Sequence, residues 1–213
     1  MIISASRRTD IPAFYADWMV NRLRAGYCAV PNPFNPKQVG RISLLPADVD
    51  TIVFWTRNPR PLMRNLSQLD SRGLPYYFQF TLLGYPRTID PKCPFRDAAV
   101  RVFQELSDQV GPRRVVWRYD PIVFTTKTTP DDHKRCFGEI AGQLRGYTQR
   151  AVISIVDEYR KAEPRMRALA EAGVTGVNCA PEEFSSLMGE LVELAAENGM
   201  ELTSCAEPVD LSQ

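Results

Sequence analysis

Histidine is almost absent from this chain, since His133 is the only one in 213 residues. A catalytic triad built on histidine therefore has a single candidate, and a metal site with several histidine ligands is excluded. His133 stands in "TPDDHKRCFGEI", which has the pattern of a helix. We expect it to be a surface residue rather than a catalyst.

Cysteine pairs are missing as well. The five cysteines lie far apart in the sequence and form no C-x-x-C motif, namely Cys28, Cys93, Cys136, Cys179 and Cys205. This spacing argues against a disulfide framework and against a locally encoded zinc or iron–sulfur site. We expect reduced thiols that are mostly buried.

Phosphate loops, long apolar runs and a strong net charge are also lacking. Neither G-x-G-x-x-G nor G-x-x-x-x-G-K-[ST] occurs, so nucleotide-phosphate binding of the usual kind is not expected. No apolar run approaches the roughly 20 residues that cross a membrane, and the N-terminus has no signal-peptide pattern. We expect a cytoplasmic protein without membrane contact. The net charge is +1, so no global basic field indicates nucleic acid, although a local basic patch could exist.

What the sequence does contain is an alternation of short β-rich runs and helical patterns. The β-rich runs cover residues 2–6, 51–56, 76–83, 114–119, 151–156 and 201–207. The helical patterns cover residues 14–25, 61–73, 94–111, 129–146, 156–173 and 181–199, with Thr129 as N-cap and Pro130 at the first helical position of the fourth. This order predicts an α/β fold, a partial (β/α) barrel of about six parallel strand–helix units, with a doubly wound sheet as the rival. We expect one domain over residues 1–213, with a hairpin-like insertion around residues 27–45.

The direction of alternate side chains separates two faces of these strands. One face is apolar almost throughout, whereas the other becomes polar toward the C-terminal end of each strand. Polar groups in a dry core cost free energy unless they are paired, so a wet, ligand-holding interior explains them better. The residues placed on this inner face are Arg8, Asp10, Asn58, Gln79, Thr81, Arg118, Asp120 and Glu207, whereas Arg7, Arg57 and Asp157 fall on the outer face. The pairs Arg8–Asp10 and Arg118–Asp120 could instead be internal ion pairs without a function.

Several long segments occur together in order: "ISASRRTDIPAFY", "NPFNPKQVGRISL", "IVFWTRNPRPL", "YYFQFTLLGY", "RVVWRYDPI" and "SCAE". On these segments the chain resembles the bacterial domain-of-unknown-function family 1848, from Ile3 to about Asp210. Similar members are usually longer and continue into a tail with the C-x3-C-x2-C spacing of radical S-adenosylmethionine enzymes. Such enzymes commonly use a six-unit partial barrel. Here the chain stops at Gln213 without that motif, so we expect no cofactor from this chain. A [4Fe–4S] cluster and S-adenosylmethionine would be expected only with the tail. The segments also contain the candidate residues Arg7, Arg8, Asp10, Thr56, Asn58, Gln79, Arg118, Asp120 and Glu207.

Three functions compete. The first is an enzyme that binds an anionic or polar small-molecule substrate, with Arg8 and Arg118 as an anion clamp. Its catalytic candidates are Arg8, Asp10, Arg118, Asp120 and Glu207, and its substrate-binding candidates are Arg7, Thr56, Asn58, Gln79 and Thr81.

The second candidate function is a metal-free hydrolase or isomerase that uses Asp120 and Glu207. The third is a non-catalytic module, for which the arginines and aromatics of "FWTRNPRPLMRN" make nucleic acid a candidate partner. The open edge of a partial barrel could also pair with a second copy or a covering partner.

Overall fold

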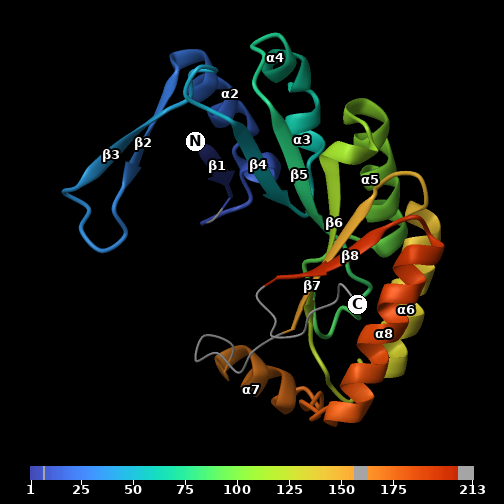
Figure 1. Cartoon of the computed structure of the whole chain (residues 1–213). Coiled ribbons are helices and arrows are strands. Elements are labelled where there is room, and N and C mark those ends of the chain that lie inside the picture. The colour runs from blue at the N-terminus through green and yellow to red at the C-terminus, as the bar shows by residue number, and fades with distance from the viewer. Residues whose placement is uncertain (7, 156–162, 206–213) are drawn as a thin grey trace. The chain divides into compact units, whose positions relative to one another are not determined.

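Strands and helices alternate in the computed structural model of the chain, which describes residues 1–6, 8–155 and 163–205 (Figure 1). Six strands form one sheet in the order β1-β4-β5-β6-β7-β8, and β2 with β3 forms a separate two-stranded sheet. The larger sheet is parallel and flanked by helices, which confirms the predicted α/β class of about six strand–helix units. The chain divides into two compact units, Met1–Phe80 and Thr81–Gln213. The single domain predicted over residues 1–213 stays a prediction, since a compact unit is not in itself an independent domain.

The first unit is built on three parallel strands. In chain order its elements are β1 (Ile2–Ala5), α1 (Ile11–Phe14), α2 (Ala16–Ala25), β2 (Tyr27–Pro31), β3 (Val39–Ser43), β4 (Thr51–Thr56), α3 (Arg60–Met63), α4 (Leu66–Asp70) and β5 (Tyr76–Thr81). Phe54 of β4 lies beside Phe78 of β5, and the two rings are 5.3 Å apart. Both side chains are fully buried, so this aromatic pair belongs to the apolar core of the unit.

The strands β2 and β3 form an antiparallel ribbon inside the segment where the sequence predicted a hairpin. Tyr27 pairs with Ser43 at one end of the ribbon, and Pro31 pairs with Val39 at the other. Gly26 precedes the ribbon with a φ of 76°, a conformation that glycine adopts without steric cost. Its carbonyl accepts a hydrogen bond of 2.9 Å from the Leu44 N–H, which closes the base of the ribbon.

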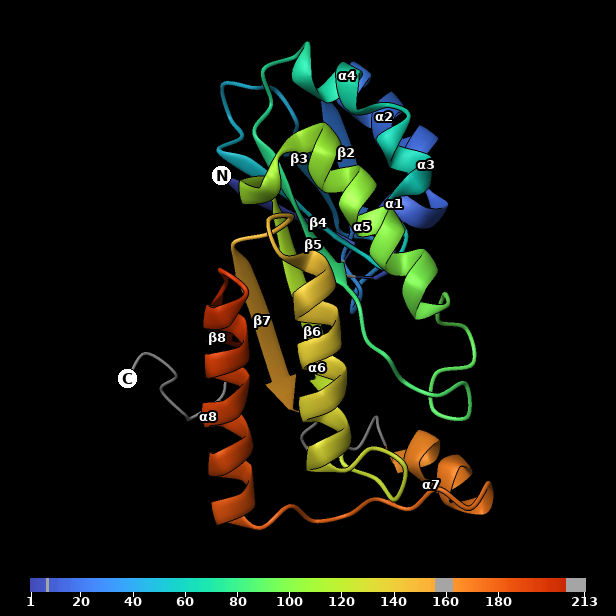
Figure 2. The same ribbon diagram turned by 90° about the vertical axis from the view of Figure 1, so that its right-hand side faces the viewer.

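The second unit repeats the strand–helix alternation. Its elements are α5 (Arg96–Val110), the 3-10 helix η1 (Pro112–Arg114), β6 (Val115–Ile122), α6 (Pro130–Leu144), β7 (Arg150–Ile155), α7 (Glu163–Glu171), α8 (Pro181–Glu197) and β8 (Glu201–Ser204). The long helices α6 and α8 lie side by side (Figure 2). Trp117 of β6 stacks on Phe137 of α6 with 4.6 Å between ring centroids, and both are fully buried. This stack fixes which face of β6 is turned to the helix.

The start of α6 agrees with its sequence. Thr129 is the N-cap, and its hydroxyl oxygen accepts a hydrogen bond from the Asp132 N–H. The Asp132 carboxylate accepts one in return from the Thr129 N–H, which completes a capping box, and Pro130 follows directly. The helix therefore begins where the sequence predicts it.

Two predicted helices have different bounds in the structure. The pattern over residues 14–25 corresponds to α2, and the short helix α1 precedes it, capped by Asp10; Tyr15, whose φ of −133° is not helical, separates the two. The pattern over residues 61–73 splits into α3 and α4 around Asn65, whose N–H bonds to the Leu62 carbonyl. Among the described residues no helix is both long and apolar enough to cross a membrane.

Removing the ring of Phe137 should strongly destabilise the protein. We expect Phe137→Ala to lower the free energy of unfolding by about 3–5 kcal/mol, because a cavity opens beside Trp117. The control is Phe14→Ala, since Phe14 is 76% exposed and should change stability by less than about 0.5 kcal/mol. Urea unfolding measures both, and equal losses would contradict the assigned core.

Candidate functional site

Three polar side chains meet where β6 and β7 end. Arg118 is only 4% exposed, and its Nε donates a 2.8 Å hydrogen bond to Oδ2 of Asp120. A terminal nitrogen of the same guanidinium also binds this oxygen, so the two residues form an ion pair. The Ser154 hydroxyl of β7 donates to the other carboxylate oxygen of Asp120. We call Arg118, Asp120 and Ser154 the β6–β7 polar group.

The apolar neighbours of these residues explain why the group faces away from α6. Trp117 and Tyr119 alternate with Arg118 and Asp120 along β6, and both aromatic rings pack against Phe137 of α6. Side chains at alternate positions of a strand point to opposite faces. Arg118 and Asp120 therefore lie on the sheet face opposite α6, as their parity in the sequence predicts.

Asp10 forms a second polar centre, in the first unit. Its Oδ1 accepts a 3.0 Å hydrogen bond from the Ala13 N–H and caps α1. Its Oδ2 accepts from the Thr56 hydroxyl at 3.0 Å and from the Arg57 N–H at 2.8 Å, at the end of β4. Burial raises the pKa of Asp10, and the hydrogen bonds from Arg57, Thr56 and Ala13 oppose that rise. This carboxylate ties α1 to the end of β4, and its role as an acid or base stays a prediction.

Arg8 does not continue the alternation of β1. The strand ends at Ala5, and Ser6 has a φ of 85°, so the parity argument does not extend beyond this turn. The Arg8 side chain is exposed and donates a 2.9 Å hydrogen bond to the carbonyl oxygen of Pro31 in β2. Its predicted role in an anion clamp stays a prediction, and its described contact is with the ribbon.

Thr56 is the last residue of β4, and Asn58 lies in the turn that follows it. Thr56 lies beside Phe80 in the β4–β5 register and is 3% exposed, so it belongs to the buried face of the sheet. The face of Gln79 is formed in β4 by Trp55 instead. Asn58 continues a turn, in which its N–H bonds to the Thr56 hydroxyl oxygen at 3.0 Å and its side-chain oxygen accepts from the Arg60 N–H. Because the chain turns after Thr56, the alternation of strand side chains no longer determines where Asn58 points, and its inward placement stays a prediction.

The other predicted residues fall into two sets. Gln79 and Thr81 are half-buried and alternate with the buried Phe78 and Phe80, as predicted. Arg7 and Glu207, together with Asp157, lie outside the described residues. The structure thus brings Arg118 together with Asp120 in one unit and Asp10 together with Thr56 in the other.

Tyr119 of β6 and His133 of α6 form a buried pair that the sequence did not lead us to expect. His133 is 2% exposed, so its prediction as a surface residue was wrong. Its Nε2 lies 3.1 Å from the Val123 carbonyl and must donate there, so Nδ1 accepts from the Tyr119 hydroxyl at 2.9 Å. Burial lowers the pKa of His133 and raises that of Tyr119, so both are neutral near pH 7. The spacing of His133 with Phe137 along α6 was the signal that could have revealed its burial.

Cys136 borders a cavity of about 230 Å³ beside this pair, which Tyr119 and Arg96 also line. Burial is the largest influence on the Cys136 thiol and raises its pKa, although Tyr119 and Arg96 act in the opposite direction. Its sulfur lies 2.3 Å from where a Cβ on Gly84 would stand, so this position accepts only glycine without movement. The Cys136 thiol therefore ionises less readily than an exposed cysteine does.

The fold and the β6–β7 polar group define an α/β protein with polar side chains at the carboxyl ends of parallel strands. The sequence pattern of the family described as Domain of unknown function (DUF1848) matches residues 2–213, and the chain belongs to this family. A comparison with curated proteins finds no match. The resemblance drawn from the motifs is thus confirmed at the level of the family, whereas the likeness to radical S-adenosylmethionine enzymes stays a prediction.

Asp10→Asn should destabilise the first unit. An amide offers one acceptor oxygen where the carboxylate receives three hydrogen bonds, so donors at Thr56 and Arg57 lose a partner. We expect a loss of about 1–3 kcal/mol in the free energy of unfolding, measured in urea. Asp108→Asn is the control because Asp108 is exposed. A variant at position 10 as stable as the control would show that these bonds contribute nothing.

His133 should make stability depend on pH. The unfolded chain protonates histidine near pH 6.5, whereas the folded chain does so only at lower pH. Stability is therefore lost as the pH falls from about 6.5 through the folded pKa, because the unfolded state then binds more protons. The difference in unfolding free energy between wild type and His133→Gln should shrink over this interval. A difference independent of pH would contradict the neutral Tyr119–His133 pair.

Proposed function

We propose that this protein is an enzyme that binds an anionic or polar organic substrate at the carboxyl ends of its parallel strands. The observation that supports this most is the burial of Arg118 with its carboxylate partner Asp120. Polar side chains at the carboxyl ends of adjacent parallel strands are the usual position of active sites in α/β proteins.

The alternative is that Arg118 and Asp120 only neutralise each other and bind no substrate. Burying a guanidinium and a carboxylate costs several kcal/mol for each ion, and an apolar pair of similar size is often at least as stable. An ion pair of this kind is therefore weak evidence for stability. Asp120 also accepts a hydrogen bond from the Ser154 hydroxyl on the next strand. The β6–β7 polar group therefore contains several polar atoms.

Each residue of the β6–β7 polar group has a distinct role in the proposal. Arg118 binds a carboxylate or phosphate oxygen of the substrate, since its planar guanidinium matches such groups with two parallel hydrogen bonds. Asp120 orients the guanidinium through Nε and one terminal nitrogen. Ser154 in turn holds Asp120 by its hydroxyl. Asp120 and Ser154 are thus positioning residues for Arg118.

An iron–sulfur cluster does not fit the residues that the structure describes. Within residues 1–6, 8–155 and 163–205 no group of three or more His, Cys, Asp or Glu side chains could hold a metal ion. Cys93 and Cys136 line different cavities. We therefore derive no step through a cluster or through S-adenosylmethionine. The paired-carboxylate hydrolase would need Glu207, which is not among the described residues.

Arg118→Lys tests the proposal. Lysine keeps the charge but loses the planar fork, so binding of a small anion should weaken. The probes are succinate and inorganic phosphate, and the measurement is the rise in melting temperature that each produces. We expect wild type to be stabilised in proportion to the logarithm of the probe concentration once the site is filled, and Arg118→Lys to show a clearly smaller rise.

The matched control is Arg96→Lys. Arg96 also pairs with a carboxylate, since its guanidinium donates to Glu139 at 2.5 Å, but its side chain is 37% exposed. This variant should keep the wild-type response to both probes. Identical responses from wild type and Arg118→Lys would mean that Arg118 takes no part in anion binding, and the purely structural ion pair would then be correct.

A further inference from the structure

Positive charge is concentrated in the first unit. Residues 1–80 contain ten Lys and Arg side chains and five Asp and Glu side chains, a net charge of +5, although the whole chain carries only +1. No acidic residue occurs between Asp17 and Asp48, and this interval includes the whole β2–β3 ribbon. The segment between Asp17 and Asp48 thus carries only positive charges, which can attract a polyanion where they are exposed.

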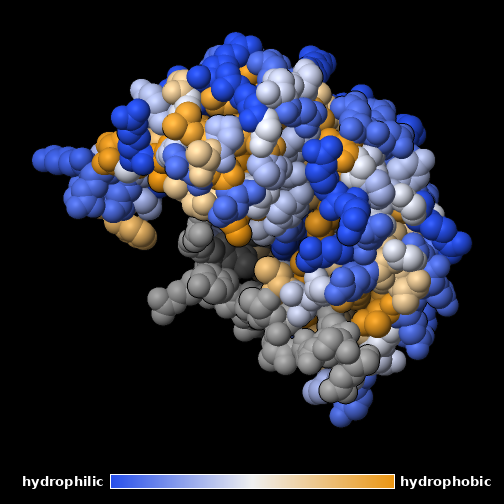
Figure 3. All heavy atoms as spheres, turned by 45° about the horizontal axis from the view of Figure 1, so that its top comes forward, coloured by the Kyte–Doolittle hydropathy of each residue, from blue (hydrophilic) through white to orange (hydrophobic). Residues whose placement is uncertain are grey.

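The ribbon is exposed over most of its length. Its two strands pair with each other and not with the six-stranded sheet. Val39 is 57% exposed and Phe34, in the connecting loop, is 95% exposed. The projecting end of the ribbon, at the left of Figure 3, shows hydrophilic and hydrophobic residues side by side. The loop therefore presents one aromatic ring to solvent beside polar and charged residues.

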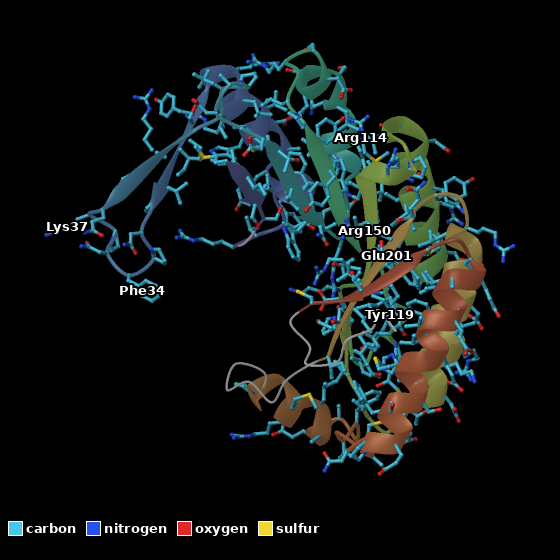
Figure 4. All side chains as sticks on the ribbon, viewed as in Figure 1. Phe34, Lys37, Arg114, Tyr119, Arg150 and Glu201 are labelled. Carbon is cyan, nitrogen blue, oxygen red and sulfur yellow. The ribbon has the colours of Figure 1, made fainter. Side chains whose placement is uncertain are left out.

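Hydrogen bonds hold the loop in one conformation. The Asn32 N–H donates to the Gln38 carbonyl at 2.8 Å, and their side chains bond at 3.0 Å. The Phe34 N–H donates to the Asn32 side chain at 2.9 Å, and the Lys37 N–H donates to the Asn35 side chain at 3.2 Å. Phe34 and Lys37 both lie at the far end of the ribbon (Figure 4). A pre-ordered loop loses less entropy when it binds a partner.

Two arginines add charge along the ribbon. The guanidinium of Arg41 in β3 lies over the ring of Tyr27 in β2, 4.2 Å from its centroid. Arg8 donates to the Pro31 carbonyl of β2. Arg8, Lys37 and Arg41 thus place cations along the strands and in the loop that contains Phe34. We call these four residues the ribbon patch.

We propose that the ribbon patch binds single-stranded nucleic acid, with a base stacked on Phe34 and phosphates against Lys37, Arg41 and Arg8. Exposed aromatic faces combined with cations are the pattern by which single strands are bound without sequence preference. A second copy of this chain fits less well, because two such ribbons would bring like charges together. A lipid bilayer fits less well too, since the amides around Phe34 would lose water on insertion. This binding is independent of the anion site at Arg118.

The test is fluorescence anisotropy with a labelled single-stranded oligonucleotide of mixed sequence, titrated at several salt concentrations. Each phosphate contact to a single strand contributes about −0.7 to the slope of log affinity against log salt concentration. Three cations in contact with phosphates should therefore give a slope of about −2. Phe34→Ala should weaken binding by about tenfold with an unchanged slope, because it removes stacking alone. Lys37→Gln should reduce the magnitude of the slope by about 0.7.

The matched controls are Phe95→Ala and Lys92→Gln in the second unit. Phe95 is 71% exposed, Lys92 is exposed, and the two are three positions apart, as are Phe34 and Lys37. Neither control should change affinity or slope. Undetectable binding at low salt overturns the proposal, and so do equal losses in ribbon and control variants. Binding to phosphatidylserine vesicles, lost in Phe34→Ala and without any oligonucleotide binding, would assign the patch to a membrane instead.

Discussion

The stack of Trp117 on Phe137 orients the side chains in the central part of β6. Because the stack fixes one face of the strand against α6, Arg118 and Asp120 must leave on the other face. Tyr119 follows Trp117 to the helix side and meets His133 there. The charged pair on one face and the neutral pair on the other therefore depend on the same aromatic contact. Because side chains alternate along this strand of eight residues, the Arg118–Asp120 ion pair and the Tyr119–His133 hydrogen bond lie on opposite faces of the sheet.

The sequence predicted the parts of the fold that follow from local periodicity. The strand–helix alternation, the cap of α6 at Thr129 and the opposite faces of β6 all agree with the structure. These features depend on neighbours close in sequence, which a reader of one chain can see. The pairing of Arg118 with Asp120 belongs to this class, because residues two apart in a strand share a face.

What the sequence could not predict depends on where strands end and on contacts distant in the chain. The alternation of side chains between the two faces of a strand ends at Ser6, because a left-handed conformation follows Ala5. It ends again after Thr56, because the chain turns toward α3. Asp10 looked like a residue at the rim of a site, yet it joins α1 to β4 through partners 46 and 47 positions away. Ser154 was not selected at all, because nothing local connects it with Asp120.

Gly84 carries a consequence for how this protein can vary. The sulfur of Cys136 occupies the space where a Cβ on Gly84 would stand. The segment after β5 and the helix α6 are therefore closely packed at this position. A side chain at position 84 would require the Cys136 thiol to turn away, α6 to shift, or a smaller residue to replace Cys136. We therefore expect the effects of substitutions at positions 84 and 136 to be coupled, a steric constraint that neither residue reveals on its own.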